Sequence, residues 1–193
     1  MLGLKLPTDP RWVNIVEKNI DEILTDHAYC EQKAASTAIS LIINFPEYPE
    51  LVDEMIALSR EEMGHFKMVH DRILKRGATL GRHRKDEYVI KLMKFFPKGG
   101  DRQEQLIHRL LYAAMIEARS CERFRLLSEQ LQDKDLASFY RKLMISEAGH
   151  YTMFLNFARK YGDREVVDTK WQDLLEYEAG IMKDLGGKEA IHG

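Results

Sequence analysis

The chain has 193 residues, enough for one domain whose hydrophobic core needs no disulfide or structural metal. With 45% hydrophobic and 31% charged residues and a net charge of −2, it is a globular protein by composition, which excludes disordered and fibrous chains. No apolar run approaches the ~18 residues of a membrane span, and the first eleven residues lack the apolar stretch of a signal peptide. Its two cysteines, Cys30 and Cys121, form no C-x-x-C pair, which favours a reducing cytoplasm and argues against a rubredoxin-type iron site.

Apolar residues recur at helical spacing along almost the whole chain, and no alternating strand pattern competes. In chain order, the predicted helices cover about 10–44 (continuous, or broken near Asn19), 50–75, 86–96, 101–132, 133–162 and 166–185. Gly77 is expected to close the second of these, Asp133 to cap the start of the fifth, and the Gly-Gly-Lys tail to fray.

Two short connections and one long one join the four longest predicted helices. This order of connections is typical of ferritin-like proteins, in which two helical hairpins are joined by a crossover. The sequence therefore predicts an all-α, ferritin-like four-helix bundle with a long crossover between its second and third helices. An additional C-terminal helix is expected to pack Trp171, Leu174, Leu175 and Ile181 against the outside of the bundle. Residues 1–193 are expected to form a single domain.

The apolar seam of each long helix is interrupted near its middle by carboxylate or imidazole side chains. The first and third helices carry a lone glutamate, and the second and fourth carry a Glu-x-x-His pair. A chain of this composition is expected to contain about one such pair by chance. Chance does not readily explain why the pairs lie on the seam and why each preceding helix carries a lone seam glutamate. The residues are Glu31, Glu62, His65, Glu117, Glu147 and His150.

The spacing places these side chains at one level. Glu31 lies about 13 residues before the end of its helix and Glu62 about 12 after the start of the next, so both are roughly 20 Å from the turn. Glu117 and Glu147 are related in a similar way around the next turn. Four buried carboxylates without cations would be strongly destabilising, whereas two divalent metals balance their charge. Carboxylate and imidazole without thiolate favour iron or manganese over a structural zinc site.

Several neighbouring residues are alternatives to these six. Glu122 lies about 140° around the helix from Glu117 and is rejected as a ligand, and Glu61 is expected to be solvated. His27 either supports Glu31 from one turn away or belongs to the core. Cys121 either lines the cavity or is an inert buried thiol. Tyrosines are expected to pack in the core, and alanines beside the glutamates to provide either a pocket or close helix packing.

Four segments resemble the MiaE-type tRNA hydroxylases: Asp26–Ala35, Ser59–His65, Ile116–Phe124 and Ser146–Tyr151. The resemblance extends from about residue 6 to 185, and EARSCERF (117–124) is its most specific part. It implies a non-haem di-iron monooxygenase that hydroxylates the isopentenyl side chain of a (2-methylthio-)isopentenyl-adenosine next to the anticodon. It also implies the six residues above as iron ligands, with dioxygen and electrons from an external reductase as co-substrates.

Residues 67–109 carry a net charge of +7, and the rest of the chain −9. This basic stretch is either a solvated face or a contact surface for the tRNA anticodon arm. The candidate tRNA-binding residues are Lys75, Arg76, Arg82, Arg84, Lys85, Lys91, Lys94 and Lys98. The protein is expected to be cytoplasmic, and a monomer or small oligomer. The rival hypotheses are a di-iron quinone-ring hydroxylase at a membrane surface, a ferritin-like iron-storage protein and a metal-free helical interaction module.

Overall fold

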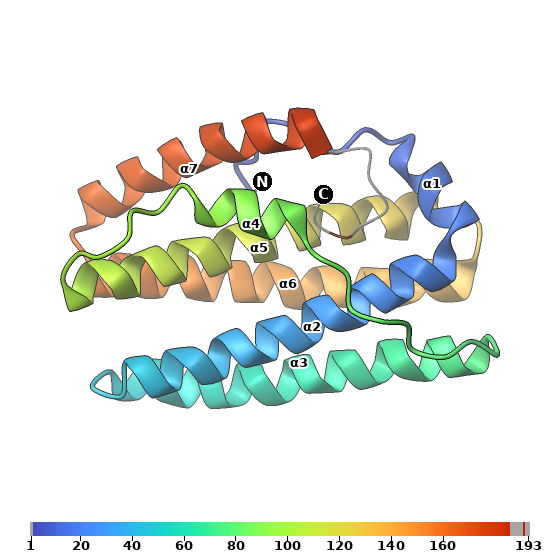
Figure 1. The fold of residues 1–193 in the computed structure, drawn as a ribbon, viewed down its shortest axis with the longest axis horizontal. Coiled ribbons are helices and arrows are strands. Elements are labelled where there is room, and N and C mark those ends of the chain that lie inside the picture. Colours follow the sequence, from blue (N-terminus) through green and yellow to red (C-terminus); the bar gives the residue numbers. More distant parts are fainter. Residues whose placement is uncertain (1, 186–190, 192–193) are drawn as a thin grey trace. The chain divides into compact units, whose positions relative to one another are not determined.

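The structure is a computed structural model that describes residues 2–185 and 191. This part of the chain forms seven helices and no strand (Figure 1). The helices are α1 (Trp12–Lys18), α2 (Ile20–Asn44), α3 (Pro49–Lys75), α4 (Glu87–Met93), α5 (Arg102–Gln130), α6 (Lys134–Tyr161) and α7 (Arg164–Leu185). No helix among these residues is both long and apolar enough to cross a membrane.

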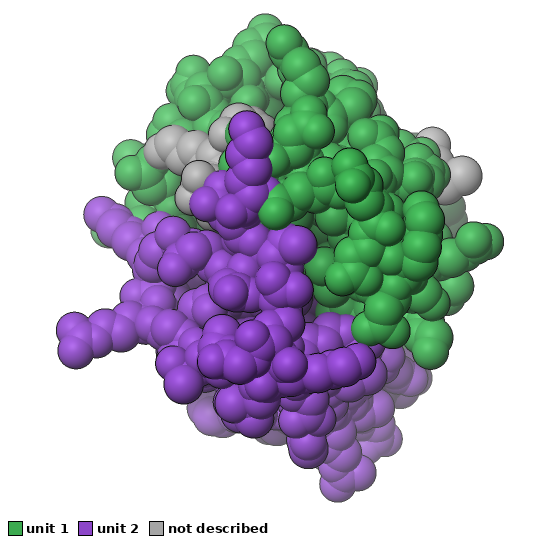
Figure 2. Space-filling view, turned by 90° about the vertical axis from the view of Figure 1, so that its right-hand side faces the viewer, with its two compact units in different colours: residues 1–17, 86–188, 192–193 green, residues 18–85, 189–191 purple. Residues whose placement is uncertain are grey.

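The described chain divides into two compact units, which Figure 2 distinguishes by colour. Among the described residues, unit 1 contains the N-terminal segment up to Glu17 and residues 86–185, and unit 2 contains residues 18–85 and Ile191. The single domain expected for residues 1–193 stays a prediction.

Unit 2 is a helical hairpin of α2 and α3, which pack along each other (Figure 1). A short turn joins them, and Pro49 begins α3, where its fixed φ suits the first helical position. After α3, Gly77 adopts a φ of +77°, which permits the chain to turn back. Residues 76–85 then return along α2, and we call them the basic strap. The Tyr29 hydroxyl donates to the Gly81 carbonyl at 2.9 Å, which anchors the strap to α2.

Unit 1 is built around α5 and α6, which pack along each other, while α7 contacts α4, α5 and α6. Helix α5 begins with a capping box, in which Asp101 and Glu104 each accept a hydrogen bond from the other's backbone N–H. Asp133 caps α6 by accepting from the Leu136 N–H, as predicted. These caps satisfy amide groups that would otherwise have no partner at the helix ends.

The predicted elements agree with the structure to within a few residues. The break near Asn19 is present between α1 and α2. Helix α5 ends at Gln130 rather than 132, because Leu131 takes up an extended conformation, and α4 is shorter than the predicted 86–96. In α7 the four residues predicted to pack inward, Trp171, Leu174, Leu175 and Ile181, are buried. The Gly-Gly-Lys tail at 186–188 lies outside the described residues.

Candidate metal centre

The first group of predicted ligands lies in unit 2. Glu31 projects from α2, and Glu62 and His65 project from α3. Their ligand atoms all lie within 4.8 Å of one another. His65 Nδ1 is 3.3 Å from Glu62 Oε2 and 3.5 Å from Glu31 Oε2. All three side chains are buried, so the group is shielded from water.

His27 adds a second imidazole to this group. It lies one helical turn before Glu31, and its Nε2 is 2.5 Å from Glu31 Oε1. The ring is fully buried. His27 therefore lies directly against the Glu31 carboxylate and restricts its orientation. This contact favours the supporting role of His27 over simple core packing.

Burial makes the ionisation of these carboxylates unfavourable. Burial above all raises the pKa of Glu31 well above its usual value, and the nearby Glu62 adds to this, while the hydrogen bond with His65 opposes it. Burial alone would lower the pKa of His65, but its hydrogen bonds to Glu31 and Glu62 and their charges outweigh this and raise the pKa to about 10. Protonation of His65 therefore balances part of the carboxylate charge of this group when no metal is bound, and a divalent cation would replace that proton.

The second group lies in unit 1 and repeats the same residue types. Glu117 projects from α5, and Glu147 and His150 project from α6. Their ligand atoms also lie within 4.8 Å of one another. His150 Nδ1 is 3.8 Å from Glu117 Oε2 and 4.0 Å from Glu147 Oε1, and the residues are buried. The structure thus brings the six predicted ligands together as two groups of three.

Each group offers two carboxylates and one imidazole from two neighbouring helices. This donor set suits iron or manganese, and a lone Glu facing a Glu-x-x-His pair is the arrangement that di-iron bundles use. The residues present therefore fit such a metal.

Comparison with known proteins identifies the relatives of this chain. The family model of tRNA-(MS[2]IO[6]A)-hydroxylase (MiaE) matches residues 2–193. The chain belongs to the MiaE family.

Two curated relatives carry the name tRNA 2-(methylsulfanyl)-N(6)-isopentenyladenosine(37) hydroxylase. The protein from Pseudomonas putida is 38% identical, over 83% of this chain and 77% of that protein. The protein from Salmonella typhimurium is 28% identical, over 84% and 77%. Among solved structures, a Synechococcus protein with aldehyde deformylating oxygenase activity has a TM-score of 0.91 and 30% identity, and the match covers 98% of this chain and 95% of that one. This similarity confirms the predicted all-α, ferritin-like fold.

The alternatives to the six predicted ligands differ in their surroundings. Glu122 accepts hydrogen bonds from the N–H of Thr8 at 3.0 Å and from its hydroxyl at 2.7 Å. Glu61 is half exposed, and its Oε1 is 3.8 Å from His65 Nε2. The Cys121 thiol donates to the Met144 carbonyl at 3.3 Å, and burial raises its pKa to about 11. Tyr140 is fully buried and packs against aromatic rings of the core.

The predicted tRNA-binding residues differ in their surroundings. Arg76 binds Asp21 at 2.5 Å, Arg84 binds Glu22 at 3.1 Å, and Lys91 binds Asp184 at 3.1 Å. Within the part of the chain that the structure describes, the other five form no ion pair and are exposed: Lys75, Arg82, Lys85, Lys94 and Lys98. Three of the eight candidates are therefore engaged in ion pairs within the protein, and the other five are exposed and could contact phosphate groups.

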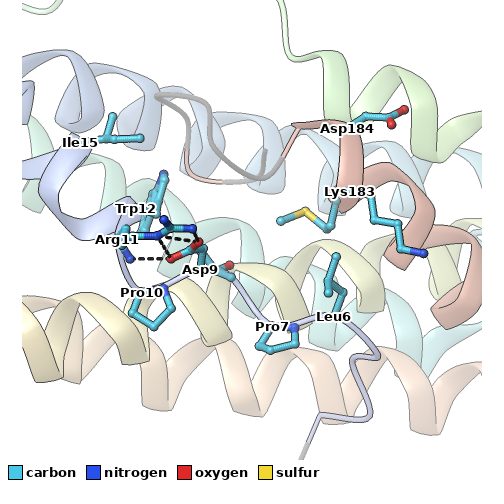
Figure 3. A pocket seen from close by; sticks show the side chains of 11 residues that line it. Leu6, Pro7, Asp9, Pro10, Arg11, Trp12, Ile15, Lys183 and Asp184 are labelled. Atoms are coloured by element: carbon cyan, nitrogen blue, oxygen red, sulfur yellow. Dashed lines mark hydrogen bonds and ion pairs between the residues drawn. The ribbon is translucent and has the colours of Figure 1, made fainter.

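The N-terminal segment and the end of α7 border a pocket of about 720 Å³ in unit 1 (Figure 3). Arg11 binds Asp9 there, and these hydrogen bonds lower the pKa of Asp9 to about 2. No histidine is among the residues that line the pocket. It therefore lacks the mixed carboxylate and imidazole set found in the two ligand groups.

Sequence analysis missed a buried ionic cluster in unit 1, whose centre is Arg119 of the EARSCERF segment. Arg119 is fully buried and binds Glu178 of α7, which is also fully buried. The i, i+3 spacing of Arg119 and Glu122 fits a helical ion pair. Because both residues face away from the apolar seam, this spacing alone does not distinguish a buried pair from a solvated one.

Proposed function

We propose that this protein is a dioxygen-dependent di-iron monooxygenase that hydroxylates the isopentenyl side chain of a (2-methylthio-)isopentenyl-adenosine in tRNA. The observation that carries the proposal is the match to the MiaE family over residues 2–193, in a chain whose described residues include two buried groups of carboxylate and imidazole. The names of both curated relatives support the same substrate.

The two irons would be held by Glu31, Glu62, His65, Glu117, Glu147 and His150. When bound, such a centre supplies the activation of dioxygen that attack on an unactivated C–H bond requires. The chain's own contribution is to provide four carboxylates and two neutral imidazoles away from bulk water. His27 would keep one Glu31 oxygen oriented. Small buried side chains next to the ligands, such as Ala35 and Ala113, would admit a slim apolar group.

The tRNA anticodon arm would contact the exposed cations of the basic strap and of the α4 region. Arg82 and Lys85 are the strongest candidates, because the strap that carries them is anchored through its neighbours Gly81 and Arg84. A preorganised surface loses less conformational entropy on binding. An adenosine beside the anticodon lies in a single-stranded loop, so no duplex has to be opened.

The reaction also needs an electron donor, for which an external reductase is the proposed partner. A tRNA substrate supports a cytoplasmic location as part of the proposal, and a monomer or small oligomer would leave the basic strap accessible.

The test is a reaction of the reduced, iron-loaded protein with tRNA bearing the isopentenyl adenosine under ¹⁸O-labelled dioxygen. The expected product is a nucleoside heavier by one labelled oxygen, detected by mass spectrometry after digestion. Label arriving from water would refute the oxygenase mechanism. A long-chain aldehyde and a quinone precursor serve as competing substrates, and turnover of either without turnover of tRNA would replace the proposed substrate.

A further inference from the structure

Three charged residues of the EARSCERF segment are buried although none belongs to the ligand groups. Arg119 and Arg123 are fully buried, and Glu122 is 7% exposed. They lie on α5, the helix that carries Glu117. Burying charge is costly unless each group is paired, so their partners indicate what the cluster does.

Arg119 uses its whole guanidinium group. Its Nε and Nη2 donate to the two carboxylate oxygens of Glu178 at 2.8 and 2.9 Å, a bidentate pair with α7. Its Nη1 donates to Glu122 at 2.9 Å, and Nη2 also donates to the Leu6 carbonyl at 3.0 Å. One side chain therefore connects α5, α7 and the N-terminal segment in three directions.

The remaining contacts close this cluster. The Tyr88 hydroxyl of α4 donates to Glu178 at 3.1 Å, and Thr8 donates twice to Glu122. Arg123 lies over the Trp12 ring, 4.3 Å from its centroid. Two arginines and two glutamates balance in charge, so the cluster is neutral as a whole.

The cluster lies on the side of α5 opposite Glu117. Residues two positions apart on a helix are about 200° apart around its axis. A rotation of the helix by roughly 10° would move a side-chain tip about 5–6 Å from the axis by about 1 Å. Metal–ligand distances tolerate only about 0.2 Å. Apolar contacts oppose such a rotation weakly because they are not directional, whereas a bidentate pair opposes it directly.

We propose that Arg119 is a positioning residue, whose bonds to Glu178 and Glu122 set the rotation of α5 and thereby the direction in which Glu117 points. This inference rests on the proposed role of Glu117 as a metal ligand. It explains why a buried ionic cluster is present where apolar residues of similar volume would stabilise the fold equally well.

The test uses the double variant Arg119→Met/Glu178→Gln, which removes one positive and one negative charge and keeps the cluster neutral. The glutamine can still accept from Tyr88. We expect a helical circular dichroism spectrum like that of the wild type and unchanged tRNA affinity. Anaerobic titration with ferrous iron should show one of two sites weakened by about 10- to 100-fold. The absorption of the cobalt(II)-loaded protein should change in intensity, because the coordination geometry differs.

Two controls separate positioning from stability. Leu127→Ala removes a buried side chain from the same helix and should lower the melting temperature without affecting metal affinity or the cobalt spectrum. Arg119→Lys keeps the charge but loses the bidentate geometry, and should show the metal defect of the double variant.

Three outcomes would contradict the inference. Wild-type metal affinity and cobalt spectrum in the double variant would show that the cluster only holds the fold together. Wild-type metal affinity and cobalt spectrum in Arg119→Lys would show that the positive charge alone is enough to position Glu117. If the wild-type protein binds neither ferrous iron nor cobalt(II), the metal site itself is refuted. This outcome differs from one in which the wild type binds metal and only the positioning role is refuted.

Discussion

The ligand groups of the two units each contain two glutamates and one histidine but are supported in different ways. In unit 2, support comes from within the hairpin, because His27 lies against Glu31 and His65 lies within 3.5 Å of both carboxylates. In unit 1, His150 is 3.8–4.0 Å from its two carboxylates, and a buried cluster with partners far along the chain holds α5. The same donor pattern can thus be supported by an adjacent side chain or by long-range ion pairs.

The difference reflects what surrounds each hairpin. Among the described residues of unit 2, α2 and α3 are the only helices, and the imidazole of His27 on α2 provides the support. Within unit 1, α4, α7 and the N-terminal segment are available as partners. Variants can test whether each form of support matters for its own group.

The largest loss of activity is expected when a proposed metal ligand is replaced, and the two ligand groups should respond alike. Glu62→Ala and Glu147→Ala should each abolish hydroxylation, by about 1000-fold or more, because each removes a carboxylate from the proposed centre. Iron content measured by mass spectrometry should fall well below two per chain, while tRNA affinity stays unchanged. The exposed neighbour Glu61→Ala is the control. Retained iron in both ligand variants would rule out these residues as ligands.

The next effect should distinguish the two units by stability. Arg119→Met leaves Glu178 and Glu122 buried without their cation, and should lower the free energy of unfolding by about 3–5 kcal/mol. In unit 2, Arg76→Met breaks the exposed pair with Asp21 and should cost less than about 1 kcal/mol. Urea denaturation followed by circular dichroism measures both. Equal effects would mean that Arg119 is not more important to stability than a surface cation.

A smaller effect is expected at His27, the local support in unit 2. His27→Phe should keep the volume of the buried ring but remove the contact with Glu31. Iron affinity should fall by about 10- to 100-fold, as is typical for residues that orient a metal ligand. Anaerobic titration with ferrous iron measures this, and His27→Gln, which retains a polar group, should lose less. An unchanged affinity in His27→Phe would assign His27 to core packing alone.

The smallest effect concerns the basic strap. Replacing Arg82 and Lys85 with Ser should weaken tRNA binding severalfold and reduce the slope of log K against log salt by about 0.7 per lost contact. Arg84→Ser is the matched control, because Arg84 pairs with Glu22 and should leave the slope nearly unchanged. Filter binding over a salt series measures both. Equal slopes in all proteins would identify the strap as a solvated surface.

The sequence predicted the helices and the two ligand groups because both depend on local spacing. A glutamate at the centre of an apolar seam is visible in the pattern, and its partner on the same helix stands three residues away. The Arg119 cluster could not be predicted in this way, since Arg119 pairs with Glu178, 59 residues later, and Thr8 with Glu122, 114 residues away. A charged residue opposite the seam is usually solvated. Only the packing of α7 and the N-terminal segment on α5 buries this one.

The environment of Cys121 bears on how the protein would withstand its own chemistry. Only the thiolate form of cysteine reacts readily with peroxide and other oxidants. With a pKa of about 11, only about one Cys121 thiol in ten thousand is ionised at neutral pH. The other cysteine, Cys30, is also buried. The Cys121 thiol of this oxygen-consuming catalyst should therefore resist oxidants that leak from the reaction.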